Sequence, residues 1–322
     1  MNTAPTILDV LAARQRLSRH LRPTPLLQSP WLSEATGASV FLKIESLQPA
    51  RSFKIRGAMH ALLRLEDAGS GREMPIVTAS AGNHGRAIAY AAETLGRRAV
   101  VFVPAAAPAT KKTAIARHGV ELHDEPADYD AAEREARAYA DREGALYVSP
   151  YNDVNVIAGA GTIALELLDE LPAFDVLVVP LGGGGLASGL GIAIDHIAPH
   201  VTIVGVEAAA STPFSTGIAR GGITTIDVSP SLADGLTGNL EPGSMTFDLV
   251  RRHVDRLVSV SEPDLTDAIR GLAGEEHLIA EGAGAAATAA VLRRSIVSPG
   301  QRAVVMLTGG NIDLSVLAAI VQ

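Results

Sequence analysis

The chain has 322 residues, 47% of them hydrophobic and only 4% aromatic, and its formal net charge is −8 at pH 7. This length predicts about two domains. A nucleic-acid-binding protein would be expected to carry a basic patch, and the sequence shows none. The chain contains no cysteine, which excludes disulfide bonds, thiolate metal sites and a cysteine nucleophile and fits a reducing compartment.

The first predicted helix, residues 6–21, mixes arginines with apolar residues and is expected to lie on the core as an amphipathic helix. No small-residue cleavage site follows it, so we do not interpret it as a targeting peptide. The longest uncharged run, residues 176–194, contains a proline and four consecutive glycines, which a lipid-exposed span could not accommodate. We therefore expect a cytoplasmic protein that binds neither nucleic acid nor a membrane.

Strands and helices are predicted to alternate along most of the chain. The predicted strands are residues 40–44, 75–79, 99–103, 120–122, 176–181, 201–207 and 303–307. The later predicted helices are residues 84–95, 110–118, 129–142, 158–171, 186–196, 263–273, 284–294 and 312–320. This alternation indicates an α/β fold with parallel sheets covered by helices.

The order of these elements also suggests how the chain divides into domains. No Pro/Gly-rich linker cuts the chain in two, so one domain is predicted to be inserted in the other. Residues 1–44 and 145–322 would form a large domain, and residues 45–144 a small α/β domain. Residues 211–245 are rich in Gly, Pro, Ser and Thr and are predicted to be irregular. Such long irregular regions are usually functional or mobile.

The first candidate for chemistry is Lys54, within the run SFKIRGA at residues 52–58. Apolar residues follow at helical spacing, so Lys54 is predicted to open a helix with Ser52 as its N-cap. The partial positive charge at a helix N-terminus disfavours an ammonium by about 0.3–1 kcal/mol. A neutral amine can attack an aldehyde, whereas an ammonium cannot. The alternative is an ordinary surface lysine in a first helical turn.

The second candidate is the run SAGNHG at residues 80–85, between a predicted strand and a predicted helix. Ligands bind at this edge of a parallel sheet. The N–H groups of the following helix could hold an anion such as a carboxylate, and the Asn83 amide could donate or accept a hydrogen bond. The alternative is a capped turn with His84 as a surface histidine.

The third candidate is the run of four glycines at residues 182–185, which lies between a predicted strand and a helix that begins at Leu186. Glycines let the backbone fold tightly around a phosphate at a helix N-terminus. Residues 182–187 also fit the dinucleotide pattern G-x-G-x-x-A, and Glu207 follows about 20 residues later, as that pattern requires. The local sequence therefore leaves a phosphate nest and a nicotinamide-nucleotide site open.

The fourth candidate is the run LTGGN at residues 307–311, in which Thr308 ends the last predicted strand. A neutral hydroxyl there could hydrogen-bond a ring nitrogen without protonating it. The alternative is a threonine that simply closes a strand before a turn.

Together, these four runs resemble those of pyridoxal-phosphate (PLP) enzymes with the tryptophan-synthase-β fold, known as fold type II. The subgroup that they resemble is the threonine and serine dehydratases and serine racemases. The resemblance covers nearly the whole chain, with the motifs in the family's order. It implies two parallel-sheet α/β domains with PLP in the cleft between them, and it suggests a homodimer.

The resemblance also assigns roles to individual residues. Lys54, with Phe53 beside it, would be joined covalently to the cofactor, Asn83 would bond the ring hydroxyl, and Thr308 would meet the pyridine nitrogen. The phosphate would be held by Gly182, Gly183, Gly184, Gly185 and Leu186. The substrate carboxylate would be bound by Ser80, Ala81, Asn83 and His84, and Ser80 is also a candidate catalytic residue.

The implied reaction is β-elimination of water from a β-hydroxy amino acid such as threonine or serine. Lys54, freed from the cofactor, would remove the Cα proton, and the released enamine would hydrolyse to a 2-oxo acid and ammonia. Other β-hydroxy amino acids, among them 3-hydroxyaspartate and phenylserine, stay open as substrates. Residues 211–245 are expected to shape the pocket for the substrate side chain.

The sequence departs from the family pattern at several positions. Serine racemases carry a proton-transferring serine where this chain has Ala81, so racemisation through that position is not expected. The usual Thr-Gly before the lysine motif is replaced by Ala50 and Arg51, and Arg51 would favour an acidic substrate only if it pointed inward.

The racemase-type metal site is also altered. Glu207 is present, but Ser211 and Pro213 occupy the positions expected to assist it, so no metal is predicted. Glu281 resembles a family glutamate near that site, and a structural salt bridge explains it equally well.

Two functions from other classes remain as alternatives. A nicotinamide-dependent oxidoreductase built on residues 182–207 would leave Lys54 and Asn83 unexplained. A catalytically silent binding protein on the same fold would have no reason to keep both the lysine and the phosphate nest.

Overall fold

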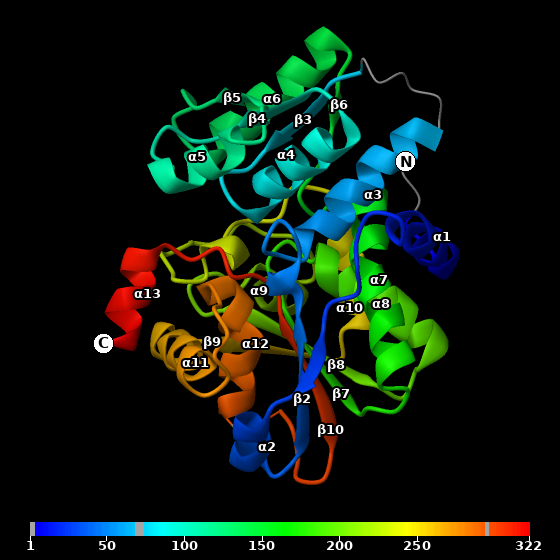
Figure 1. Cartoon of the computed structure of the whole chain (residues 1–322), viewed down its shortest axis with the longest axis vertical. Coiled ribbons are helices and arrows are strands. Elements are labelled where there is room, and N and C mark those ends of the chain that lie inside the picture. Colours follow the sequence, from blue (N-terminus) through cyan, green and yellow to red (C-terminus); the bar gives the residue numbers. More distant parts are fainter. Residues whose placement is uncertain (1–3, 68–73, 294–295) are drawn as a thin grey trace.

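The computed structural model describes residues 4–67, 74–293 and 296–322, and these form two sheets that are covered by helices. The larger sheet has the strand order β1-β2-β10-β7-β8-β9, and the smaller one the order β5-β4-β3-β6 (Figure 1). Every pairing is parallel except that of β1 with β2. The predicted α/β class with parallel sheets is confirmed.

The strands of the larger sheet are β1 (Leu26–Gln28), β2 (Ser39–Ile44), β7 (Val176–Pro180), β8 (Thr202–Ala208), β9 (Arg256–Val260) and β10 (Arg302–Leu307). Those of the smaller sheet are β3 (Ile76–Ala79), β4 (Ala99–Phe102), β5 (Glu121–His123) and β6 (Leu146–Tyr147). The chain therefore leaves the larger sheet after β2, builds the smaller sheet and returns at β7. We propose on this basis that the small domain is an insertion, and β6 extends its sheet beyond residue 144.

The first helices in chain order are α1 (Ile7–Leu17), α2 (Pro30–Thr36), α3 (Lys54–Asp67), α4 (Asn83–Leu95), α5 (Ala109–Ala116), α6 (Tyr129–Glu143) and α7 (Val154–Glu170). The remaining helices are α8 (Gly185–Ile197), α9 (Pro213–Arg220), α10 (Met245–His253), α11 (Glu262–Gly274), α12 (Gly282–Leu292) and α13 (Leu314–Val321). None of these described helices has both the length and the apolar character that crossing a membrane would require.

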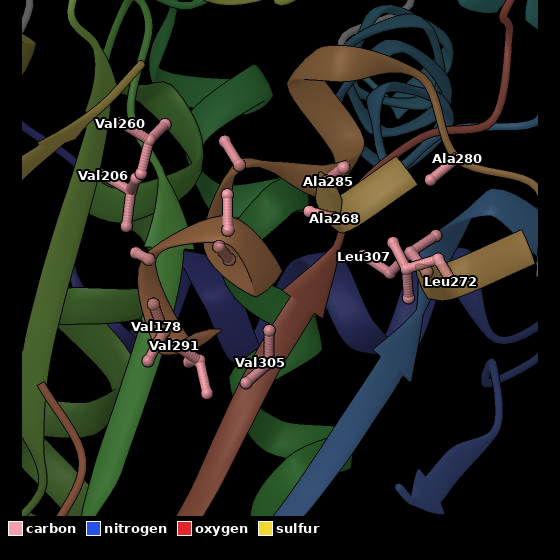
Figure 2. Close-up of a cluster of buried hydrophobic side chains, with 14 of the residues drawn as sticks. Val178, Val206, Val260, Ala268, Leu272, Ala280, Ala285, Val291, Val305 and Leu307 are labelled. Carbon is pink, nitrogen blue, oxygen red and sulfur yellow. The ribbon is translucent and has the colours of Figure 1, made fainter. Parts of the chain in front are cut away.

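Each face of the larger sheet carries its own hydrophobic core. Along β7, Val176 and Val178 join the cluster under α11 and α12, whereas Leu177 and Val179 join the cluster under α7 and α8. Figure 2 shows the first cluster, with Val178 and Val305 facing the residues of α12. This alternation follows from the period of two residues along a strand, and burial of both faces is what a parallel sheet requires.

Helices α7 and α8 pack unusually close together through glycines. A Cβ at Gly161 would lie 2.6 Å from the carbonyl oxygen of Gly189, so neither position has room for a larger side chain. The close contact fixes the axis of α8 and therefore the place of the glycine loop that precedes it.

Among the helices and strands described above, the sequence did not predict six, namely β1, α2, β6, α9, α10 and β9. Helix α9 lies within the segment that we predicted to be irregular. The predicted N-cap role of Ser52 is also wrong, because the buried Ser52 hydroxyl has no hydrogen-bond partner. The helix begins at Lys54, and the Arg56 N–H donates to the carbonyl of Phe53.

Candidate active site

The four sequence runs meet at the carboxyl edge of the larger sheet. The Phe53 N–H donates to the carbonyl of Thr308 at 3.0 Å, which joins the lysine run to the end of β10. The Asn311 side-chain amide donates to Asn83 Oδ1 at 2.6 Å, which joins β10 to the start of α4. Lys54 Nζ donates to the carbonyl of Pro150 at 2.8 Å, and the next residue, Tyr151, packs on the glycine loop. The structure thus places all four runs in one region.

Lys54 is the first residue of α3, and its amine lies in an environment that disfavours positive charge. Burial lowers the pKa of Lys54 from 10.5 to about 8. The sequence predicted the direction of this shift from the helix N-terminus, but desolvation is the larger cause. A large fraction of the amine is therefore neutral at weakly alkaline pH, which is the form that attacks an aldehyde.

The helix that carries Lys54 is anchored by a buried ion network. Arg56 Nε donates to Glu45 Oε2 at 2.8 Å, and Arg56 Nη1 donates to Glu166 Oε1 at 2.6 Å. Lys43 Nζ lies 2.9 Å from Glu166 Oε2. Because these residues come from β2, the turn after it, α3 and α7, the network fixes the start of α3 against both the sheet and a neighbouring helix.

The glycine loop is shaped so that larger residues cannot replace its glycines. Gly184 has a φ of 84°, in the left-handed region that favours glycine. A Cβ at Gly184 would lie 2.6 Å from Phe214 Cζ, and one at Gly183 would lie 2.5 Å from Tyr151 Cδ1. Thr246 Oγ1 donates to the carbonyl of Gly183 at 2.8 Å and holds the loop in place.

Helix α8 begins directly after this loop, at Gly185, with Leu186 buried behind it. The first N–H groups of an α-helix have no partner within the helix, and the helix dipole adds partial positive charge at the same end. The arrangement suits a phosphate group. Residues 235 and 236 close the other side, because a Cβ at Gly182 would lie 2.9 Å from the Cα of Leu236.

Asn83 begins α4 and lies between two polar partners. Its Oδ1 accepts from Asn311, and its Nδ2 donates to Glu281 Oε1. The sequence left open a structural salt bridge for Glu281. In the described part of the chain, its carboxylate contacts the Asn83 amide and forms no salt bridge. Burial raises the pKa of Glu281 to about 7, an effect that the hydrogen bond from Asn83 opposes.

Thr308 is buried at the end of β10. Its hydroxyl lies 3.4 Å from the carbonyl oxygen of Ala283, which is longer than a normal O–H···O hydrogen bond. The hydroxyl is therefore only weakly engaged and remains available to another acceptor or donor, as the assignment to a ring nitrogen requires.

The loop that was expected to bind a carboxylate is partly exposed from Ser80 to Asn83. Ser80 Oγ accepts from the Gly82 N–H at 3.2 Å. His84 is buried, and its Nε2 lies 3.2 Å from the carbonyl oxygen of Val148. Burial and the nearby Lys54 lower the pKa of His84 to about 3, so the ring is neutral. The His84 ring belongs to the interior, which leaves the backbone of this residue for any contact with substrate.

Glu207 does not have the free carboxylate that a dinucleotide site needs. Its Oε1 accepts from the Phe214 N–H at 2.8 Å, and its Oε2 accepts from both the N–H and the hydroxyl of Ser215. The carboxylate therefore caps the start of α9. Within the described ranges, no group of three His, Asp or Glu side chains is arranged to hold a metal ion.

Three residues of this region were not given a role from the sequence, namely Tyr151, Asn311 and Arg86. Asn311 lies within the LTGGN run, but no local signal shows that it reaches Asn83. Arg86 lies one turn after Asn83 on α4, and its Nη1 donates to Asn311 Oδ1. Tyr151 has no sequence signature at all, because its contacts with the glycine loop arise only in the folded chain.

The fold and this group of residues define a protein that can hold an aldehyde-bearing phosphate ester. A family model described as pyridoxal-phosphate dependent enzyme matches residues 17–309, and the chain belongs to this family. Its α/β fold with parallel sheets is that of the tryptophan-synthase-β-like PLP enzymes of fold type II.

Individual relatives cover nearly the whole chain. L-threonine ammonia-lyase of Thermotoga maritima is 39% identical over 98% of this chain and 78% of its own length. The beta-hydroxyaspartate dehydratase of Paracoccus denitrificans is 34% identical over 97% of this chain and 98% of its own. The solved structure of maize serine racemase superposes with a TM-score of 0.92 at 30% identity, covering 98% of this chain and 97% of that one.

The residues present fit PLP, the cofactor of this family. Lys54 supplies a buried amine of lowered pKa for the aldehyde, and the loop before α8 supplies a glycine cradle for the phosphate. The Asn83 amide is available for the ring hydroxyl and the Thr308 hydroxyl for the ring nitrogen.

Proposed function

We propose that the protein is a PLP-dependent ammonia-lyase that dehydrates and deaminates a β-hydroxy amino acid, with threonine and serine as the default substrates. The observation that carries this proposal is the single region that holds both the buried Lys54 amine and the glycine cradle before α8. The threonine ammonia-lyase of Thermotoga maritima supports the reaction class.

The chain's own residues would divide the work as follows. Lys54 would hold the cofactor and, when free, would accept the proton from Cα, because its lowered pKa makes the neutral amine accessible. The loop from Ser80 to Asn83 would bind the substrate carboxylate, and Thr308 would keep the ring nitrogen unprotonated. PLP, when bound, supplies an electron sink for the negative charge at Cα. The β-hydroxyl would take up a proton and leave as water, and the released enamine would hydrolyse to a 2-oxo acid and ammonia.

Ala81 supports elimination over racemisation. Racemisation needs a second group that delivers a proton to the opposite face of Cα, and a methyl side chain has no proton to exchange. The resemblance to maize serine racemase is therefore one of fold, because Ala81 of this chain cannot donate a proton.

An acidic β-hydroxy amino acid is the second candidate substrate. The relative in Paracoccus denitrificans is named for beta-hydroxyaspartate and aligns over nearly its whole length. Arg51 is exposed. The pKa of the Arg86 guanidinium is lowered mainly by burial, then by the charge of Arg117 and, to a smaller extent, by the charge of Arg51. In the described part of the chain, neither Arg51 nor Arg86 forms an ion pair with a carboxylate, so this cationic edge could accept a second carboxylate.

The decisive experiment is the Lys54→Ala variant of the purified protein. We expect it to lose the visible absorbance of the bound cofactor, the borohydride-trapped adduct and ammonia release from threonine and serine. Lys112→Ala, which removes a lysine paired with Asp124 on the surface of the small domain, is the matched control and should keep all three. Ammonia release or visible absorbance in Lys54→Ala would refute the proposal. Relative rates with threonine, serine and 3-hydroxyaspartate then identify the substrate class.

We also infer that the protein is a cytoplasmic homodimer. The family resemblance suggests the dimer, and the absence of cysteine fits a reducing compartment. Sedimentation of the purified chain measures the mass of the assembly, and a monomer at micromolar concentration would contradict the inference.

A further inference from the structure

A chain of hydrogen bonds runs from a cation to a carboxylate through two side-chain amides. Arg86 Nη1 donates to Asn311 Oδ1, and Asn311 Nδ2 donates to Asn83 Oδ1 at 2.6 Å. Asn83 Nδ2 then donates to Glu281 Oε1. Asn311 Nδ2 also donates to the carbonyl of Ala50 at 3.1 Å, which fixes that amide a second time.

The two ends of this series of hydrogen bonds decide which group donates and which accepts at each contact. A guanidinium can only donate hydrogen bonds, and an ionised carboxylate can only accept them. If the Asn83 amide rotated by 180°, its N–H groups would face those of Asn311 and its oxygen would face the carboxylate of Glu281. Both contacts would become repulsive. The Asn83 amide therefore has one stable orientation, with one N–H on Glu281 and its second N–H free.

Glu281 is held firmly enough to impose that orientation. It is buried at the start of α12, and its backbone N–H donates to the carbonyl of Gly309 at 3.2 Å. A Cβ at position 309 would overlap Glu281 Oε1, so the glycine in the LTGGN run makes the space that the carboxylate occupies.

The carboxylate titrates close to neutral pH. Burial and, to a smaller extent, the nearby Asp234 raise the pKa of Glu281, while Asn83, Lys111 and Arg86 lower it, and the net value is about 7. Above about pH 7 the group is ionised and only accepts. Below it, the protonated carboxyl can also donate, so Glu281 no longer selects one orientation of the amide and only Asn311 still opposes the rotation.

We propose that Glu281 is a positioning residue which, with Asn311 and Arg86, aims a donor N–H of Asn83 at the ring oxygen of the cofactor and holds this orientation less firmly when it is protonated. The inference rests on the role of Asn83 in the proposed function. It does not depend on which substrate the enzyme uses, because its test reads the bound cofactor directly.

The test is a pH titration of the visible absorbance of the PLP-loaded protein without substrate. We expect a spectral transition near pH 7 that is absent from Glu281→Gln, since a glutamine does not titrate. We also expect Glu281→Gln to bind PLP about tenfold more weakly at pH 8, because a glutamine oxygen can still accept from Asn83 but the contact loses its charge and the amide can also present its NH2 group. Glu276→Gln is the matched control, because Glu276 accepts a hydrogen bond from Ser29 away from this cluster.

The variant Asn311→Asp tests the middle of this series of hydrogen bonds. This variant keeps an acceptor for Arg86 but cannot donate to Asn83, so we expect weaker PLP binding with the transition near pH 7 retained. It also keeps the inference testable if Glu281→Gln fails to fold. A transition that persists in Glu281→Gln, or unchanged PLP affinity in Asn311→Asp, would overturn the inference. Protein that binds PLP and releases no ammonia would refute the proposed function alone.

Discussion

Replacing Gly183 by alanine should damage the phosphate cradle. The new Cβ would lie 2.5 Å from Cδ1 and 2.9 Å from Cβ of Tyr151, whereas ordinary van der Waals contacts are 3.4–4 Å long. The loop or the ring must therefore move by about 1 Å, and such overpacking typically costs about 1–3 kcal/mol.

The Tyr151 ring cannot easily give way. Its hydroxyl accepts from the Glu241 N–H at 2.9 Å, and its backbone carbonyl lies against Gly185, where a Cβ would come within 2.9 Å. The loop is therefore expected to shift instead, which moves the N–H groups that would hold the phosphate. If the same energy is lost from cofactor binding, PLP affinity falls by about 5- to 150-fold.

The assay is a fluorescence titration of the cofactor-free protein with PLP, accompanied by urea unfolding. Gly274→Ala is the control, because Gly274 ends α11 and a Cβ there would meet no atom within 4 Å. That variant should bind PLP normally and should be unchanged or up to about 1 kcal/mol more stable. Wild-type affinity and wild-type stability in Gly183→Ala would refute the clash argument.

Two further predictions concern the lysine and the network beneath it. In a urea unfolding experiment, Arg56→Ala should lower the free energy of unfolding by about 3–5 kcal/mol, because it leaves buried carboxylates unpaired. The control is Arg98→Ala, which breaks an exposed pair with Glu121 and should lower that free energy by at most about 1 kcal/mol. The rate at which cofactor-free protein captures PLP at Lys54, followed by borohydride trapping, should rise with pH and level off above about pH 8. A rate that keeps increasing towards pH 10 would show that the amine has an ordinary pKa.

The alternation of strands and helices was readable from the sequence because buried parallel strands are short apolar runs and the helices between them are longer. Elements outside that pattern were missed. Strand β9 is largely exposed or half-buried, and α9 has only 8 residues and lies among residues that favour turns, so neither resembles a buried apolar strand or a long helix in the sequence. Their stability comes from contacts such as the capping of α9 by Glu207.

The sequence by itself determined which residue types occupy the candidate site. The lysine run, the asparagine turn, the glycine loop and the late threonine each have local chemistry that is fixed by side-chain type and backbone freedom. Each run alone left alternatives open, and the resemblance of the four runs together to a known family predicted the PLP site, with which the family match agrees.

Only the tertiary structure decided how these residues are tuned. The partner of Asn83 is Glu281, 198 positions away along the chain, and the amine of Lys54 is held by a carbonyl 96 positions away. Glu207 was excluded from a dinucleotide site by α9, which the sequence did not predict. A pKa or a hydrogen-bond partner depends on what burial removes and which distant groups it brings near, and neither is encoded in neighbouring residues.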